Sequence, residues 1–153
     1  MRCLSQGRIV KVTTDIDTLR SEIRDKSVRV IDVRREDDYK QNHIPNAVNL
    51  PLANLLSDDS PERVVKLVNS MGIDDEMPVV VYDDTFGALA SRVAWTLEYL
   101  GHSDVSLLET TYSTWKSMGL ENDKTVPEIQ NKSHSIKLRP EILATSDYLE
   151  NAK

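Results

Sequence analysis

The stretch PVVVYDDTFG at residues 78–87 decides the fold expected of this chain, because a run of β-branched residues passes directly into a polar turn. Such runs are typical of a strand that is buried on both faces of a parallel sheet. A long helix is expected to follow from about Ala88 to Leu100, and Gly101 is expected to close it. Ligand sites in such sheets lie beyond the carboxyl ends of the strands, so the turn after Tyr82 is a candidate functional site.

The alternation of strand and helix repeats at least four times along the chain. Strands are predicted at residues 9–12, 28–33, 48–50 and 105–108, and helices at 16–23, 36–41, from Pro61 to just before Gly72, and 112–118. Thr13, Thr14 and Asp15 are candidate caps of the first helix, and residues 52–60 are expected to form a connector. This pattern predicts an α/β domain with a mostly parallel sheet and helices on both faces.

Composition bounds the class of protein. The 153 residues suffice for one domain, and 19 Lys and Arg against 25 Asp and Glu give a formal net charge of −6. This charge disfavours nucleic acid as a partner, and the lack of an apolar run of about 18 residues argues against a membrane protein. The first twelve residues lack the apolar stretch of a secretory signal, which predicts a cytoplasmic location. The single cysteine, Cys3, excludes an internal disulfide and is interpreted as an incidental thiol.

Four stretches, taken in order, carry a resemblance to a known family. They are VIDVR at residues 30–34 with Tyr39, HIPNA at 43–47, VVVYDD at 79–84, and Leu107-Leu108 with Tyr112, Trp115 and Gly119. Over residues 8–120 the combination resembles the rhodanese homology domain. The resemblance implies a three-layer α/β fold with a central parallel sheet and helices on both faces. In active members it also implies a sulfurtransferase that carries sulfane sulfur as a cysteine persulfide.

The active members of that family place their cysteine directly after the strand that matches residues 79–82, in a loop of inward-facing amides. Amide dipoles near a helix start stabilise a thiolate. Here the matching residue is Asp83, and a carboxylate cannot accept sulfane sulfur. No catalytic residue is therefore expected in this chain. With Ala90-Ser91-Arg92, the turn is similar to the non-catalytic N-terminal half of two-domain thiosulfate and 3-mercaptopyruvate sulfurtransferases, whose second half supplies the cysteine.

The resemblance implies two groups of site residues. The vestigial active-site loop, expected to meet a second domain, consists of Asp83, Asp84, Thr85, Phe86, Gly87 and Ala88. The scaffold group consists of Asp32, Arg34, His43, Arg92 and Trp115. Phe86 is the expected apolar contact of the loop, because an exposed Phe needs a reason. Asp32 and Arg34 are interpreted as a structural pair at a strand end, and His43 as a residue that fixes a turn. No metal ion or cofactor is expected.

The remaining histidines, the tryptophans and the Thr110-Thr111 pair are interpreted as structural residues. His102 and His134 are expected at the surface, and His43 has no second histidine or cysteine nearby that would make a metal site. Trp95 and Trp115 are expected in the core, with partial exposure near a domain partner left open for Trp115. Thr110-Thr111 stands where the family commonly has Gly-Gly, and β-branched residues tolerate a positive φ badly, so a different backbone path is expected there.

The C-terminal part suggests that the chain belongs to something longer. Residues 121–140 have the polar, irregular composition of a linker. Residues 142–149 then repeat the pattern of residues 12–19, in which an apolar strand end leads into a Thr- and Asp-rich helix start. Residues 141–153 are therefore interpreted as the start of a truncated second rhodanese domain. That domain is the expected partner, and a homo-oligomer formed through the exposed loop and tail is a further possibility.

The sequence leaves two functions of other classes open. An aspartate directly after a buried strand is also the nucleophile of some Mg²⁺-dependent phosphotransfer enzymes. The adjacent acids Asp83 and Asp84 are not spaced for that chemistry, because their side chains are expected to diverge. The other alternative is a stand-alone inactive rhodanese module that binds a protein or an anion. A reading frame that continues past Lys153 into a cysteine-bearing domain favours the two-domain enzyme over the module.

Overall fold

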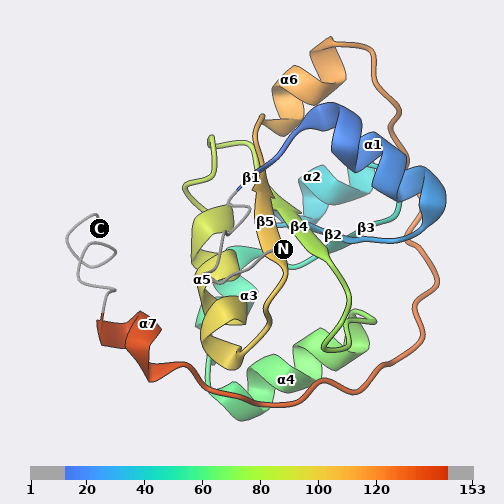
Figure 1. The fold of residues 1–153 in the computed structure, drawn as a ribbon. Coiled ribbons are helices and arrows are strands. Elements are labelled where there is room, and N and C mark those ends of the chain that lie inside the picture. Colours follow the sequence, from blue (N-terminus) through green and yellow to red (C-terminus); the bar gives the residue numbers. More distant parts are fainter. Residues whose placement is uncertain (1–12, 145–153) are drawn as a thin grey trace.

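The computed structural model describes residues 13–144 as one layered α/β unit (Figure 1). Its strands are β1 (Thr13–Thr14), β2 (Arg29–Asp32), β3 (Ala47–Asn49), β4 (Val79–Tyr82) and β5 (Val105–Leu108). Its helices are α1 (Ile16–Asp25), α2 (Glu36–Gln41), α3 (Leu52–Leu56), α4 (Pro61–Ser70), α5 (Ala90–Leu100), α6 (Tyr112–Ser117) and α7 (Pro140–Ala144). None of the helices in this range is long and apolar enough to cross a membrane.

The five strands form one parallel sheet in the order β1-β5-β4-β2-β3. The chain runs outward from β2 to β3 and then returns to β4 on the other side of β2, so the strand order reverses between β2 and β4. Asp32, the last residue of β2, lies in register with Tyr82, the last residue of β4. The polar residues that follow these two strands are thereby brought together at the edge where sheets of this class bind ligands.

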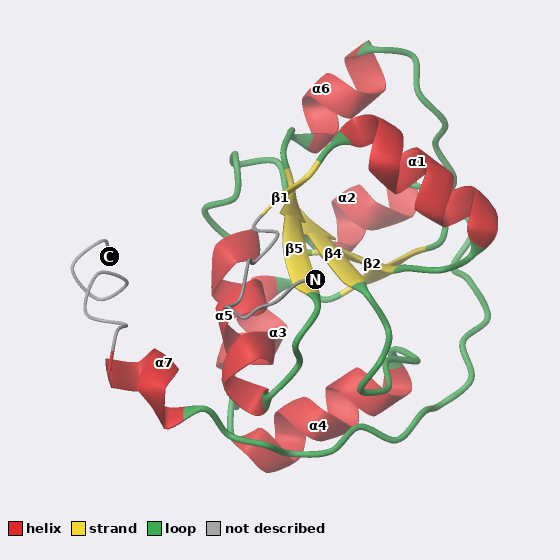
Figure 2. Cartoon of the chain, in the orientation of Figure 1, coloured by secondary structure: helices red, strands yellow, loops and turns green. Residues whose placement is uncertain are grey.

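The sheet is buried on both faces, as the uninterrupted β-branched runs predict. Side chains alternate along β4, so Val79 and Val81 join one core cluster while Val80 and Tyr82 join the other. Helices α3, α4 and α5 cover the first face, and α1, α2 and α6 cover the second (Figure 2). The expected three-layer fold with a central parallel sheet is confirmed.

Local sequence signals explain most of the element boundaries. Asp15 caps α1 by accepting a hydrogen bond from the Thr18 amide at 2.7 Å, and Pro61 begins α4, where its missing N–H costs nothing. The expected cap role of Thr13 and Thr14 is wrong, because these residues form β1 beside β5. The strand expected at 9–12 lies outside the described residues.

Three further boundaries differ from the expectation. Residues 52–60 are not only a connector, because α3 forms after Pro51 and buries Leu55 in the first core cluster. Helix α5 begins at Ala90 rather than Ala88, since the amides before it turn inward to bond the side chain of Asp83. The helix at 36–41 and the strand at 105–108 are confirmed at both ends.

Residues 121–139, called the strap below, contain no helix and no strand longer than an isolated bridge, yet they are docked along the domain. His43 and Asp123 exchange two backbone hydrogen bonds of 2.8 Å, and the amide of Lys132 donates to the Asn69 carbonyl of α4. Figure 1 shows the strap running from α6 past α4 to α7. Residues 142–144 were expected to end a strand, but they form part of α7, so the expected strand is wrong. Residues 145–153 lie outside the described range.

Candidate functional site

The carboxylate of Asp83 lies at the centre of the loop that connects β4 to α5. Its Oδ1 accepts the amides of Thr85 and Gly87, both at 2.9 Å. Its Oδ2 accepts the amides of Leu89 at 2.9 Å and Ala90 at 2.8 Å, together with the Thr85 hydroxyl at 2.8 Å. Four backbone donors and one hydroxyl therefore converge on one side chain that is only 2% exposed.

This ring of donors fixes the charge of Asp83 and limits its chemistry. Burial acts to raise the pKa of the carboxyl, but the amides of Thr85, Ala90 and Gly87 outweigh it, and the pKa is lowered. The group is therefore an anion whose oxygens have their acceptor sites occupied by the loop. Such a carboxylate has no lone pair free for a metal ion or a phosphoryl group, so the geometry gives no support to the magnesium phosphotransfer hypothesis.

Phe86 stands at the tip of this loop in an unusual backbone conformation. Its φ is +57° and its side chain is 88% exposed, and the next residue, Gly87, also has a positive φ of +94°. An aromatic residue in the left-handed region is a conformational outlier, which persists when the surrounding structure determines it. The bonds from Thr85 and Gly87 to Asp83 clamp the backbone on either side of Phe86. The loop thus presents a large apolar side chain to solvent.

Asp84 points away from Asp83, as expected for adjacent acids. Its carboxylate accepts the amide of Ser113 at 2.9 Å and the hydroxyl of the same residue at 2.7 Å, which ties the loop to the first turn of α6. Thr111 caps that helix through a bond of 3.1 Å from the Thr114 amide. Thr111 has an extended φ of −89°, so the Thr-Thr pair avoids the positive φ that Gly-Gly would allow.

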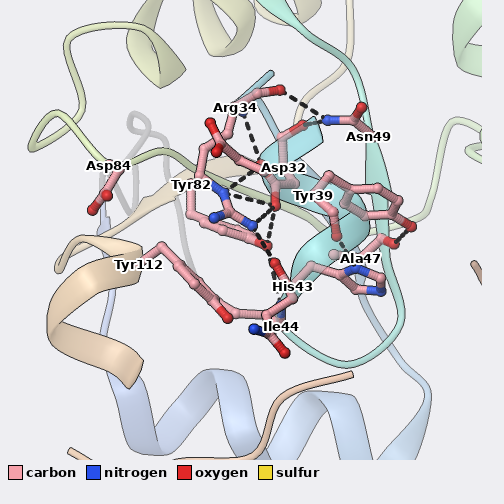
Figure 3. Close-up of polar contacts among 12 residues, drawn as sticks. Asp32, Arg34, Tyr39, His43, Ile44, Ala47, Asn49, Tyr82, Asp84 and Tyr112 are labelled. Atoms are coloured by element: carbon pink, nitrogen blue, oxygen red, sulfur yellow. Dashed lines mark hydrogen bonds and ion pairs between the residues drawn. The ribbon is translucent and has the colours of Figure 1, made fainter. Parts of the chain in front are cut away.

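Asp32, Arg34 and Tyr82 form a buried cluster beside this loop (Figure 3). The Arg34 Nη2 lies 2.8 Å from Asp32 Oδ2, its Nε lies 3.1 Å from both carboxylate oxygens, and the Tyr82 hydroxyl donates to Oδ2 at 2.5 Å. The guanidinium also donates to the Asn42 carbonyl and lies 3.9 Å above the ring of Tyr112. Burial raises the pKa of Tyr82, and the negative charge of Asp32 raises it further, so the phenol remains a donor.

His43 joins three parts of the chain. Its ring stacks on Tyr39 with 3.9 Å between the ring centroids, its Nδ1 lies 2.8 Å from the Tyr39 carbonyl oxygen, and its Nε2 lies 2.8 Å from the Thr125 carbonyl oxygen. The Tyr39 hydroxyl donates to the Ala47 carbonyl at 2.6 Å. These contacts join the turn before β3 to α2 and to the strap.

The side chains of the remaining predicted residues, Arg92 and Trp115, make their polar contacts outside the Asp83 loop. Arg92 pairs with Asp59 at 2.8 Å and lies 5.1 Å above the Trp95 ring, which is half-buried rather than a core residue. Trp115 is fully buried and donates to the Glu121 carbonyl at 2.8 Å. The open possibility that Trp115 is partly exposed near a domain partner is therefore wrong.

The expected surface position is wrong for two histidines. His102 and His134 were expected at the surface, but their residues are 1% and 8% exposed and their rings bond each other. No sequence signal near either residue marks this pair, because the strap brings His134 back over the domain 32 positions later. Among residues 13–144, no group of three or more His, Cys, Asp or Glu side chains is arranged to hold a metal ion.

The chain is similar in sequence to two curated proteins. A thiosulfate sulfurtransferase of Corynebacterium glutamicum is 31% identical over 104 residues, covering 64% of this chain and 35% of the relative. The sulfur carrier protein TtuD of Thermus thermophilus is 27% identical over 152 residues, covering 92% of this chain and 53% of the relative. The chain thus spans about a third to a half of the length of these curated relatives.

The fold has a close counterpart among solved structures. The 3-mercaptopyruvate sulfurtransferase SseA of Escherichia coli superposes with a TM-score of 0.75 at 21% identity, over 93% of this chain and 63% of that chain. At this identity the match establishes the fold alone. The sequence family described as the rhodanese-like domain matches residues 15–118, a range that runs from the cap of α1 to the end of α6. The chain therefore belongs to the family of rhodanese-like domains.

Proposed function

We propose that this chain is the non-catalytic rhodanese domain of a cytoplasmic thiosulfate or 3-mercaptopyruvate sulfurtransferase. In this proposal a cysteine in a second domain carries the sulfane sulfur, and the present domain supplies stability and one wall of the cleft. The observation that carries the proposal is the carboxylate of Asp83 in the amide ring after β4. A carboxylate there is fixed and saturated with donors, so it has neither the sulfur nor the free electron pair that persulfide chemistry requires.

The length of the relatives supports the presence of a second domain. The chain covers 35% of the Corynebacterium protein and 53% of the Thermus protein, so both have room for another unit of similar size. The proposed second unit does not begin with a strand at residues 142–144, because these residues form part of α7. A homo-oligomer formed through the same loop and tail, and a stand-alone module, are the alternatives that the experiments below distinguish.

The isolated chain is expected to transfer no sulfur from thiosulfate to cyanide above the rate in buffer. It is also expected to gain no mass of about 32 Da, that of one sulfur atom, when treated with thiosulfate. Thiocyanate formation and intact-protein mass spectrometry measure the two outcomes. Cys3→Ser is the matched control, because it removes the single thiol of the chain. A sulfur adduct on the wild-type chain that disappears in Cys3→Ser would overturn the proposed inactivity.

The loop of Phe86 is proposed to contact the second rhodanese domain of the parent protein. Replacing Phe86 by Ser is expected to weaken that association by about 2 kcal/mol, roughly thirtyfold, because a buried aromatic anchor is lost. The change is expected to leave folding intact, since the side chain is 88% exposed. Calorimetric titration with the second domain as a separate polypeptide measures the affinity.

Val126→Ser is the matched control for this experiment, because Val126 is an exposed apolar residue on the strap rather than on the loop. Equal affinities of both variants and the wild-type chain would show that the Phe86 loop is not the interface. A chain that self-associates through Phe86 but ignores the second domain would instead favour the homo-oligomer. If the folded chain binds neither the second domain nor another copy of itself, the two-domain proposal is rejected in favour of a stand-alone module.

A further inference from the structure

His102 and His134 form a buried pair at the junction of the strap with the end of α5. The Nδ1 of His102 lies 2.9 Å from the Nε2 of His134, with the rings tilted by 40° and their centroids 5.1 Å apart. Both residues are nearly inaccessible to solvent, so neither ring can exchange these contacts for water without local opening. The hydrogen-bond partners therefore constrain how many protons the pair carries.

The two outer nitrogens of the pair both face oxygen acceptors. The Nε2 of His102 lies 2.7 Å from the carbonyl oxygen of Met77. The Nδ1 of His134 lies 2.6 Å from the carbonyl oxygen of Ser135 and 3.2 Å from Oδ1 of Asp75. Carbonyl and carboxylate oxygens only accept hydrogen bonds, so each outer nitrogen must carry a hydrogen.

Counting hydrogens fixes the protonation state that satisfies all of these contacts. The two outer nitrogens need one hydrogen each, and the contact between His102 and His134 needs one more. Two neutral rings supply two hydrogens, which leaves two lone pairs facing each other in one contact. Two cationic rings supply four, which places two hydrogens against each other between the rings. Every contact is satisfied only when the pair carries three hydrogens. Three hydrogens on two imidazole rings correspond to one positive charge.

We propose that the His102–His134 pair carries one positive charge shared across its inner hydrogen bond, and that this single protonation state fastens the strap to the domain. Gain of a second proton in acid or loss of the shared proton in alkali then weakens the attachment. The strap is accordingly held most firmly in a middle range of pH. This inference does not depend on the proposed function.

Charged groups lie close to both rings of the pair. Burial lowers the pKa of His102, which favours its neutral form, although Asp104 and Asp75 act in the opposite direction. Asp75 lies against His134 and accepts the amide and hydroxyl of Ser135, and these bonds lower the pKa of its carboxyl. Lys137 is the other charged group acting on Asp75. His134 thus has a carboxylate partner, whereas His102 faces only the Met77 carbonyl and the other ring.

The pair lies at the centre of the contacts that dock this end of the strap. The amide of His134 donates to Oδ1 of Asn69, and the amide of Lys137 donates to the Leu100 carbonyl at 2.8 Å. The strap passes so close to the end of α5 that a Cβ on Gly101 would lie 2.6 Å from the Lys137 carbonyl oxygen. Loosening the pair would therefore release the backbone that leads into α7.

Two measurements on the 153-residue chain test the proposal. Nitrogen-15 imidazole NMR is expected to show three protonated nitrogens in the pair near neutral pH. Amide hydrogen exchange, corrected for the intrinsic rate, is expected to show maximal protection of Lys137 and of Arg139 in the same range. The amide of Arg139 donates to the Tyr99 carbonyl at 3.0 Å. That protection should fall roughly tenfold on the acid side and on the alkaline side of this range, while the amide of Val81 stays protected because the core remains folded.

His134→Gln supplies the variant, since it removes the ionisable ring and is expected to remove the bell-shaped pH dependence at Lys137 and Arg139. Two protonated nitrogens at neutral pH, or wild-type protection that varies with pH in one direction only, would overturn the proposal. A His134→Gln chain that retains the bell shape would do the same. If that variant fails to fold, the NMR count on the wild-type chain still decides the question.

Discussion

Asp83→Cys, made in the Cys3→Ser background, is expected to gain about 32 Da on treatment with thiosulfate, whereas the parent chain gains nothing. The thiolate would attack the sulfane sulfur of thiosulfate, form a sulfur–sulfur bond and release sulfite with the bonding electron pair. The amides of Gly87, Leu89 and Ala90 already point at this position, and they would lower the pKa of the new thiol. This variant is the most direct test of the site.

Side-chain length indicates which sulfur species the ring would hold best. The Sγ of a cysteine takes the place of the Asp83 Cγ, one bond short of the carboxylate oxygens that the amides now contact. The outer sulfur of a persulfide reaches the place of those oxygens. The ring is therefore expected to stabilise the persulfide more than the free thiolate, and the adduct should survive removal of excess thiosulfate.

Asp84→Cys in the same background is the matched control. Asp84 is the next residue of the loop, but its carboxylate contacts Ser113 rather than the amide ring. It is expected to form little or no stable adduct. Circular dichroism establishes that both variants fold. A folded Asp83→Cys chain without an adduct, or equal adducts at both positions, would show that the amide ring does not function as a persulfide cradle.

Asp32→Ala is expected to lower the free energy of unfolding by about 4 kcal/mol at neutral pH, the usual cost of leaving one partner of a buried ion pair alone. The Asp32 carboxylate is fully buried and the Arg34 side chain is 10% exposed, so water cannot replace the lost anion. The Tyr82 hydroxyl would lose its acceptor at the same time. Urea unfolding followed by circular dichroism measures the effect.

Glu36→Ala provides the comparison, because the Glu36–Lys40 pair is an exposed contact along one helix and is expected to contribute little. The double variant Asp32→Ala/Arg34→Met should recover part of the loss, since it removes the uncompensated cation. A loss below about 1 kcal/mol for Asp32→Ala would contradict the assignment of this pair as a buried scaffold.

Much of the fold was predictable because it depends on short-range patterns. The β-branched run at 79–82, Pro61 at a helix start and Gly101 at a helix end each specify their element locally. Helix α3 was not predicted because it has only five residues and follows Pro51. A segment of that length is too short for a helical hydrophobic period to distinguish it from a loop. Its formation depends on burying Leu55 against the sheet, which is a tertiary contact.

The candidate site was predictable in position but not in detail. The place of Asp83 after β4 follows from the sequence, whereas the closure of the loop by amides as far along as Ala90 requires the backbone path. The burial of His102 and His134 depends on a docked strap whose composition resembles a linker. A contact between two residues that are 32 positions apart produces no hydrophobic period in the sequence, so the pattern of residues does not predict it.

The ring around Asp83 has a consequence for recognition. Because folding alone sets the loop geometry, the backbone at Phe86 is already ordered before any surface approaches it. A flexible loop loses conformational entropy when it binds a partner, whereas a loop that is already ordered loses little. Asp83 thus holds the loop in one backbone conformation, so a partner that bound the ring of Phe86 would have little further backbone to order.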